Sequence, residues 1–169
     1  MPFVTLVPTS NTSPDPGQGG LTVTSPTNTG HSSSTAVASD LSDSQQRSCI
    51  WSGFAATNRQ NLSVTLKIDH TSSGGRTGIG ANNSFTLDYS LNNGGAWTNA
   101  VTRERYSGSQ GPTTFSVALS AGQDLTQVQV RDSMQASTVS DGESADATAT
   151  IANIKLEVLV VDNSVIVMM

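Results

Sequence analysis

The stretch NLSVTLKIDH (Asn61–His70) and the stretch SFTLDYSL (Ser84–Leu91) decide the fold, because apolar and polar side chains strictly alternate in both. The apolar positions are Leu62, Val64, Leu66 and Ile68 in the first and Phe85, Leu87, Tyr89 and Leu91 in the second. Successive side chains of a strand point to opposite faces, so each run predicts a strand with one buried face, as in antiparallel sheets. The link between them, residues 70–83, contains four glycines and predicts a long hairpin-like loop rather than a crossover helix.

Short strand-like segments with polar turns continue on both sides of this pair. The turn Asn92-Asn93-Gly94-Gly95 is the strongest hairpin signal, with residues 97–102 as the returning strand. Further strands are predicted at 35–38, 48–54, 114–119, 125–131 and 147–161, and a polar loop at 135–146. These spacings predict an all-β fold, an antiparallel β-sandwich of jelly-roll or Greek-key type with an extended N-terminal arm. A barrel is the less favoured alternative.

The last long strand changes its alternation. Ala147, Ala149 and Ile151 share one phase, whereas Ile154, Leu156, Val158 and Val160 share the other. A one-residue slip moves side chains to the opposite face of a sheet, so we predict a bulge or strand break near Ala152 and Asn153.

Composition divides the chain into three parts. Residues 1–47 are rich in proline and glycine and are predicted to form an extended arm with short edge strands, 48–161 the β-sandwich, and 162–169 an apolar assembly tail. The arm is either a flexible leader or a segment that lies on a neighbouring subunit. The tail either completes its own sheet or pairs with another subunit.

The charge pattern and the N-terminal sequence indicate which classes of partner to expect. The 169-residue chain has a formal net charge of −5, and its eight Lys and Arg residues are scattered rather than clustered. A nucleic-acid binder would carry a basic stripe, so no nucleic acid is expected as a partner. The N-terminus lacks a secretory signal, and the longest apolar run is too short to span a bilayer, so we expect the chain to fold in a cytoplasm without a membrane.

The sequence carries no catalytic constellation. Cys49 lies in an apolar run, and His31 and His70 lie in loop-like sequence, so a nucleophile with its base is not indicated. Asp141, Glu143 and Asp146 could gather oxygens around Ca²⁺, but solvated turn acids are the favoured interpretation. We therefore expect a non-enzymatic protein with no cofactor and no metal.

An exposed aromatic ring among amides would suit a sugar. The candidate glycan contacts are Trp97, Asn99 and Tyr106, because an aromatic platform can stack on a sugar ring while amides bond to its hydroxyls. The alternative is that Trp51 and Trp97 are core anchors.

Apolar residues near both termini are the candidate contacts of an oligomer. These are Phe3, Val4, Leu6, Leu21, Val23, Val160, Val165, Ile166 and Val167. An unpaired apolar edge strand is commonly covered by another subunit.

Several motifs together resemble the β-sandwich (jelly-roll-like) structural proteins of tailed-phage virions, such as decoration or fibre proteins. They are SCIWSGF at 48–54, LSVTLKIDH at 62–70, FTLDYSL at 85–91 before the NNGG turn, LTQVQVRDS at 125–133 and ATATIANIKLEV at 147–158. The resemblance implies a virion component, assembled in the host cytoplasm, that contacts itself and other virion proteins such as the major capsid protein. A carbohydrate-binding β-sandwich of a surface or adhesion protein is the alternative.

Overall fold

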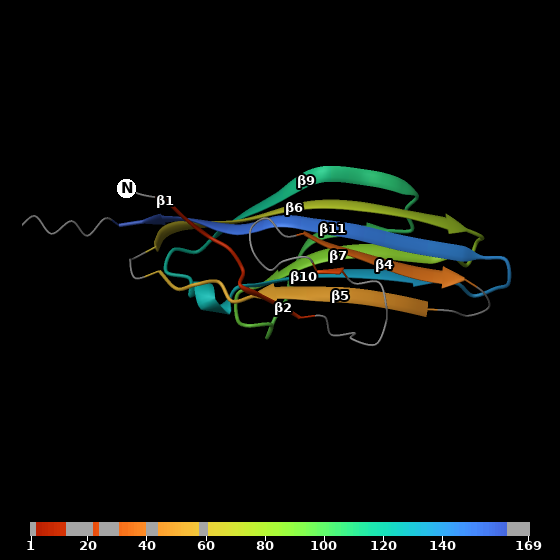
Figure 1. Ribbon diagram of the computed structural model, residues 1–169, viewed down its shortest axis with the longest axis horizontal. Helices are drawn as coiled ribbons and strands as arrows, with labels where there is room; N and C mark the ends of the chain where they lie inside the picture. Colours follow the sequence, from red (N-terminus) through yellow and green to blue (C-terminus); the bar gives the residue numbers. More distant parts are fainter. Residues whose placement is uncertain (1–2, 13–21, 24–30, 40–43, 58–60, 162–169) are drawn as a thin grey trace, which may run out of the picture.

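The computed structural model describes residues 3–12, 22–23, 31–39, 44–57 and 61–161, and these residues form two antiparallel β-sheets packed face to face (Figure 1). One sheet holds β3 (Thr22–Val23), β4 (His31–Ser39), β11 (Ser144–Val160), β6 (Asn61–Thr77) and β9 (Gly108–Leu119) in this order, with β1 (Phe3–Leu6) paired to β11. The other holds β2 (Ser10–Thr12), β5 (Ser44–Ser52), β10 (Gln129–Ser137), β7 (Asn82–Ser90) and β8 (Thr98–Glu104). A single 3-10 turn, η1 (Leu125–Gln127), precedes β10.

The strand order is that of a jelly roll. Strands β4, β11, β6 and β9 are neighbours in one sheet, and β5, β10, β7 and β8 are neighbours in the other. Consecutive strands therefore change sheet at every connection from β4 to β11 except the one between β7 and β8. This arrangement confirms the predicted antiparallel β-sandwich and selects the jelly roll from the two types expected.

The predicted hairpin between the two alternating runs is wrong. β6 pairs with β11 and β9, whereas β7 pairs with β10 and β8, so the two runs lie in opposite sheets. The connection is also short, because β6 continues to Thr77 and β7 begins at Asn82. Alternation shows that a strand has one buried face, but it does not show which strand pairs with it. Position 74 within β6 requires a glycine, because a Cβ there would lie 2.6 Å from the Asp146 carbonyl oxygen.

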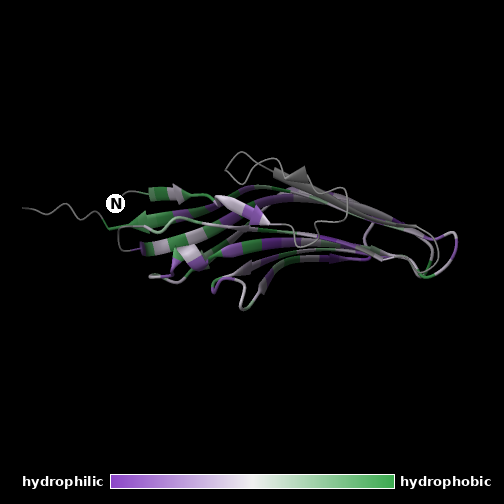
Figure 2. Ribbon diagram, turned by 60° about the horizontal axis from the view of Figure 1, so that its bottom comes forward, coloured by the Kyte–Doolittle hydropathy of each residue, from purple (hydrophilic) through white to green (hydrophobic). Residues whose placement is uncertain are grey.

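The core lies between the sheets and follows the predicted alternation. Aliphatic and aromatic residues fill one half of it, including Val64, Leu66, Ile68, Phe85, Leu87, Leu156 and Val158. Leu62, expected with them, is 39% exposed, because the pairing of β6 with β11 shifts register there and leaves Leu62 without a partner on β11. Figure 2 shows that apolar residues gather at the end of the sandwich that carries β1. Burial of this apolar surface is the main favourable contribution to folding.

The other half of the core is built from small residues and one buried amide. Asn83 on β7 donates from Nδ2 to the carbonyl oxygens of Tyr106 and Asp146, each at 2.9 Å, and its Oδ1 accepts from the Tyr106 amide at 2.9 Å. Ala145 and Ala147 of β11 are buried in the same half. The Asn83 amide therefore ties β7 to the opposite sheet where large apolar side chains are scarce, since a satisfied buried polar group specifies its partners.

The predicted NNGG hairpin is present, and the predicted loop at 135–146 is shorter than expected. The NNGG segment joins β7 to β8, with Asn93 at φ 56° and Gly94 at φ 83°, which confirms the hairpin; the returning strand spans residues 98–104. The predicted loop at 135–146 is shorter, because β10 continues to Ser137 and β11 begins at Ser144. In the described ranges, no helix has the length and apolarity needed to cross a membrane.

The N-terminal segment contributes strands to both sheets. The short edge strands expected within residues 1–47 are present as β1, β2 and β3, and β2 pairs with β5. β4 and the first residues of β5 also lie upstream of residue 48, so the sandwich itself includes part of the 1–47 segment. The role of this segment as an assembly arm stays a prediction, and the 162–169 tail lies outside the described residues.

The phase change in β11 is a bulge, as predicted. The pairing of β11 with β6 shifts register between Ala152 and Lys155, and Asn153 has φ 49°. On both sides of the shift the apolar residues point into the core, from Ile151 before it to Ile154 after it. One extra residue thus keeps both halves of the strand buried on the same face.

Replacing Asn153 tests whether its left-handed backbone determines the bulge. Asn153→Gly tolerates the positive φ and loses only the side-chain hydrogen bond to Asp69. Asn153→Val loses this hydrogen bond and also places a β-branched residue at a positive φ. We expect the valine variant to have a free energy of unfolding about 1–2 kcal/mol below that of the glycine variant. Urea denaturation of both proteins measures the difference. Equal stability would assign any effect of the mutations to the lost hydrogen bond instead.

Candidate functional site

The outward side of the five-stranded sheet is a regular grid of polar side chains, which we call the polar face. Strand register places three rows across β5, β10, β7 and β8: Ile50, Arg131, Asp88 and Asn99; Ser48, Ser133, Thr86 and Thr102; and Gln46, Gln135, Ser84 and Glu104. The residues between them on each strand point into the core. Because a strand alternates its faces, the pattern that buries the core also produces this surface.

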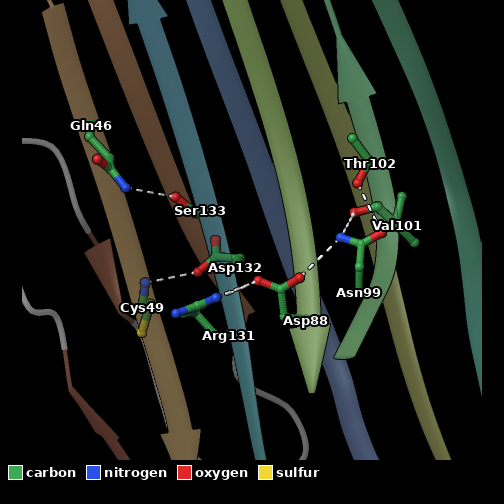
Figure 3. A network of polar contacts seen from close by, with 9 residues as sticks. All are labelled: Gln46, Cys49, Asp88, Asn99, Val101, Thr102, Arg131, Asp132 and Ser133. Atoms are coloured by element: carbon green, nitrogen blue, oxygen red, sulfur yellow. Dashed lines mark hydrogen bonds and ion pairs between the residues drawn. The ribbon is translucent and has the colours of Figure 1, made fainter. Parts of the chain in front are cut away.

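A chain of polar contacts crosses the first two rows (Figure 3). Thr102 Oγ1 donates to Asn99 Oδ1 at 2.9 Å, and Asn99 Nδ2 donates to Asp88 Oδ1 at 3.0 Å. The other Asp88 oxygen accepts from Arg131, whose Nη2 lies 2.8 Å away. The Asp88 side chain is largely buried by these contacts, so the carboxylate is held as the anchor of the arginine.

Trp97 closes one end of the polar face. The Arg131 guanidinium carbon lies 4.3 Å from the centre of the Trp97 ring, which is a cation–π contact. The ring remains partly exposed. The arginine is thus fixed from one side by a carboxylate and from the other by an aromatic ring.

Two shallow recesses lie on the polar face. The first has a volume of about 330 Å³ and is lined by Gln46, Ser48, Ile50, Thr86, Arg131 and Ser133. The second, of about 470 Å³, is lined by Gly80, Asn82, Ser84, Glu104, Arg105, Gln135, Ser137 and Val139. Gln46 donates from Nε2 to Ser133 Oγ at 3.2 Å in the first recess. Hydroxyl and amide groups dominate both, and such groups can both donate and accept hydrogen bonds.

The structure brings together two of the three predicted glycan contacts. Trp97 and Asn99 both meet the Asp88–Arg131 pair. Tyr106 does not, because it is only 8% exposed and packs in the core. Its ring is covered by Arg103, whose guanidinium carbon lies 4.1 Å from the ring centre, so we correct the expectation that Tyr106 offers a stacking surface.

The predicted oligomer contacts lie in different environments. Phe3 is 72% exposed, whereas Val4 and Leu6 are partly buried against the core. Val160 is wholly buried and cannot form part of a surface of the folded chain, which corrects that assignment. Val23 lies in β3. Leu21, Val165, Ile166 and Val167 lie outside the described residues.

Glu143 holds together the loop that joins β10 to β11. Its carboxylate accepts from the backbone amides of Gly80 at 2.7 Å, Val139 at 3.0 Å and Ser140 at 3.1 Å. These bonds lower the pKa of Glu143. Among the described residues no three His, Cys, Asp or Glu side chains are grouped as metal ligands. Glu143 therefore has a structural role in this loop.

Asp132, Cys49 and His70 are ionisable groups buried inside the sandwich. Asp132 Oδ1 accepts from the Cys49 amide at 3.0 Å, while Oδ2 has no hydrogen-bond partner in the described part of the chain. Burial raises the pKa of the Asp132 carboxyl to about 7, and burial together with Asp132 raises the pKa of the Cys49 thiol to about 12. His70 lies in β6 rather than in a loop, and burial lowers its pKa. A protonated Cys49 at neutral pH is a packing residue, not a nucleophile.

Sequence reasoning missed Asp132 and Arg131, although a signal for Asp132 existed. The inward phase set by Val128 and Val130 continues to residue 132, which places this carboxyl in the core. No local pattern pairs Arg131 with Asp88, because that contact depends on β10 lying beside β7.

The chain is only distantly similar to the solved structures that comparisons find. No model of a protein family matches the chain, and no curated protein sequence matches it. Similar solved structures include the carbohydrate-binding module TmCBM61 in complex with β-1,4-galactotriose, at 11% identity and a TM-score of 0.33, over 92% of this chain and 87% of that one. CBM28, specific for non-crystalline cellulose, is 12% identical with a TM-score of 0.32, over 79% and 78%.

A viral protein is also among the similar structures. The structure of the infectious bursal disease virus Gx strain is 15% identical with a TM-score of 0.24, over 76% of this chain and 35% of that one. These similarities are too distant to identify a ligand or partner of this chain. The chemistry of the polar face is the basis for its function.

Replacing Asp132 tests the buried carboxyl through pH. A carboxyl with a raised pKa keeps its proton in the folded state between about pH 4 and 7 while the unfolded chain loses it, so the free energy of unfolding falls as pH rises through that range. Asp132→Asn removes this loss and keeps an acceptor for the Cys49 amide. We compare the free energy of unfolding of the variant with that of the parent at each pH. This difference should favour the variant by about 1–3 kcal/mol more at pH 8 than at pH 4.

The control is Asp69→Asn. Hydrogen bonds from Thr114 and Asn153 lower the pKa of Asp69, so its charge stabilises the fold as pH rises, and this variant should lose stability relative to the parent. Urea denaturation at pH 4 and pH 8 measures both variants. A parent and an Asp132→Asn protein with parallel pH profiles would contradict the assignment.

Proposed function

We propose that the chain is a non-enzymatic, carbohydrate-binding β-sandwich module that holds a glycan on its polar face. The observation that carries this proposal is the grid of short hydroxyl and amide side chains bordered by Trp97 and Arg131. A sugar presents many hydroxyls, each a donor and an acceptor, above an apolar ring face. A binding site for it therefore combines polar groups of both kinds with an aromatic side chain.

The first recess supplies the polar groups. Ser133 and Thr86 lie side by side on β10 and β7, and Gln46 reaches Ser133 from β5. Ile50 contributes an apolar surface among them. This mixture matches a ligand with polar edges and apolar faces better than it matches a lipid or a nucleic acid, whose binding needs a continuous apolar or basic surface.

Arg131 is held in place before any ligand arrives. Asp88 fixes its guanidinium through Nε and Nη2, and Trp97 covers one of its faces. Nη1 takes part in none of the hydrogen bonds found among the described residues. Since a fixed donor loses little conformational entropy on binding, this arrangement favours recognition.

The same contacts support binding without catalysis. Asp88 accepts hydrogen bonds from Asn99 and Arg131, so it serves as an anchor rather than as an acid or base. A catalytic carboxyl would need to face the ligand with a pKa suited to proton transfer.

Tryptophan fluorescence tests the proposal. Trp51 is buried, whereas Trp97 is partly exposed on the polar face, so a bound glycan should change emission and acrylamide quenching of Trp97. The probes are cellohexaose, β-1,4-galactohexaose and maltohexaose. Trp97→Ala should abolish the signal and weaken binding of the recognised sugar, measured by calorimetry, by about tenfold.

Ser116→Ala is the matched control, because Ser116 is exposed on β9 in the opposite sheet. It should bind like the parent. Absence of binding to all three sugars by calorimetry, or an unchanged affinity of Trp97→Ala, would contradict the proposal.

A second candidate function, a structural component of a tailed-phage particle, is favoured by one exposed aromatic residue. Phe3 projects from β1, whose partner is β11. An exposed phenyl ring on a short edge strand is a natural contact for another protein. In this proposal the chain decorates or stabilises a virion assembled in the host cytoplasm, and its partners are further copies of itself and other virion proteins such as the major capsid protein.

Light scattering of the full-length chain behind a sizing column tests this second candidate. We expect an oligomer that Phe3→Ser, or truncation after Val161, converts to smaller species. Ile79→Ser is the matched control, because Ile79 is 94% exposed at the opposite end of β6 from the Asn61 end beside β1. A monomer at all concentrations, or equal effects of both serine variants, would contradict self-association through β1.

A further inference from the structure

The two recesses of the polar face adjoin. Gln46 of the first recess lies directly opposite Gln135 of the second in the pairing of β5 with β10. Thr86 of the first and Ser84 of the second occupy successive outward positions on β7. The two recesses are therefore neighbours along β10 and β7, and we call the pair the trough.

The trough is long enough for several sugar units. It extends along β7 from the level of Asp88 to the level of Asn82, which is six residues. At the rise of an antiparallel strand this is roughly 20 Å, the length of a short oligosaccharide. A single sugar would occupy only one end.

The trough is lined by short side chains and by two glutamines, with larger side chains at its ends. Its middle holds Ser133, Thr86 and Ser84 together with the longer Gln46 and Gln135. Trp97 and Arg131 stand at one end, and Arg105 and Val139 at the other. A linear chain that lies along the strands can therefore contact these groups one after another.

The charges of the trough nearly cancel. Arg131 is paired with Asp88 at 2.8 Å, and Glu104 lies beside Arg105 in the second recess. The whole chain has a net charge of −5. A polyanionic glycan would meet no net positive surface and would be repelled by the acidic protein.

From these features we infer that the trough binds a linear, uncharged glycan lengthwise along β10 and β7, with contacts over both recesses. This inference rests on the proposed glycan-binding function and adds the ligand class and its direction. Because each sugar unit makes its own contacts, affinity depends on chain length.

Calorimetry with cello-oligosaccharides and β-1,4-galacto-oligosaccharides of two to six units tests the inference. We expect the recognised series to gain at least about tenfold in affinity from the disaccharide to the hexasaccharide. Trp97→Ala should weaken all lengths. Gln135→Ala and Ser137→Tyr, at the far recess, should weaken the hexasaccharide more than the disaccharide and so reduce the gain with length. Thermal melts of both far-recess variants verify that they are folded.

A charged competitor completes the experiment. A galacturonic acid hexasaccharide should bind at least about tenfold more weakly than β-1,4-galactohexaose or cellohexaose, whichever is recognised. Equal affinity for two and six units, or tighter binding of the acidic chain, would overturn the lengthwise neutral trough while glycan binding itself stands. Absence of binding to every uncharged sugar would overturn both proposals.

Discussion

The rest of the structure depends on one constraint, which is that two sheets share a single core. The strands of each sheet bury one face against the opposite sheet, and in this topology nearly every connection from β4 to β11 carries the chain across the core. The strict alternation in β6 and β7 follows from this requirement, since a slip of one residue would expose a row of buried side chains. Where the sequence cannot keep the phase, as at Asn153, a bulge restores it.

Departures from an apolar core lie at particular places. Asn83 is buried but satisfied, and its amide links β7 to the backbone of the opposite sheet. Asp132 is buried with one oxygen unpartnered among the described residues, at a position that the alternation of β10 reserves for an apolar side chain. The first is a means of joining the sheets where large side chains are scarce. The second places a titratable group in the interior and couples the stability of the fold to pH.

The polar face is the other product of the same alternation. Its side chains are the outward residues of strands whose inward residues make the core, so its rows come from the sheet itself. Jelly rolls serve as lectin-like domains and as viral capsid domains, and the fold does not choose between these uses. What favours glycan binding is local chemistry: Trp97 and Arg131 fixed at the end of a hydroxyl-lined trough. What favours a virion role is Phe3, exposed at an edge.

The sequence by itself determined the fold class, the buried residues of most strands, the NNGG hairpin and the bulge in β11. Each of these depends on neighbours within a few residues, and alternation and turn chemistry record such neighbours directly. Only the tertiary structure decided how the strands other than the NNGG hairpin pair, that Tyr106 is buried, and that Arg131 meets Asp88 and Trp97. The physical reason is that strands pair through backbone hydrogen bonds between segments far apart in the sequence. The alternation of a strand records only that one of its faces is buried, and this is equally compatible with many partner strands.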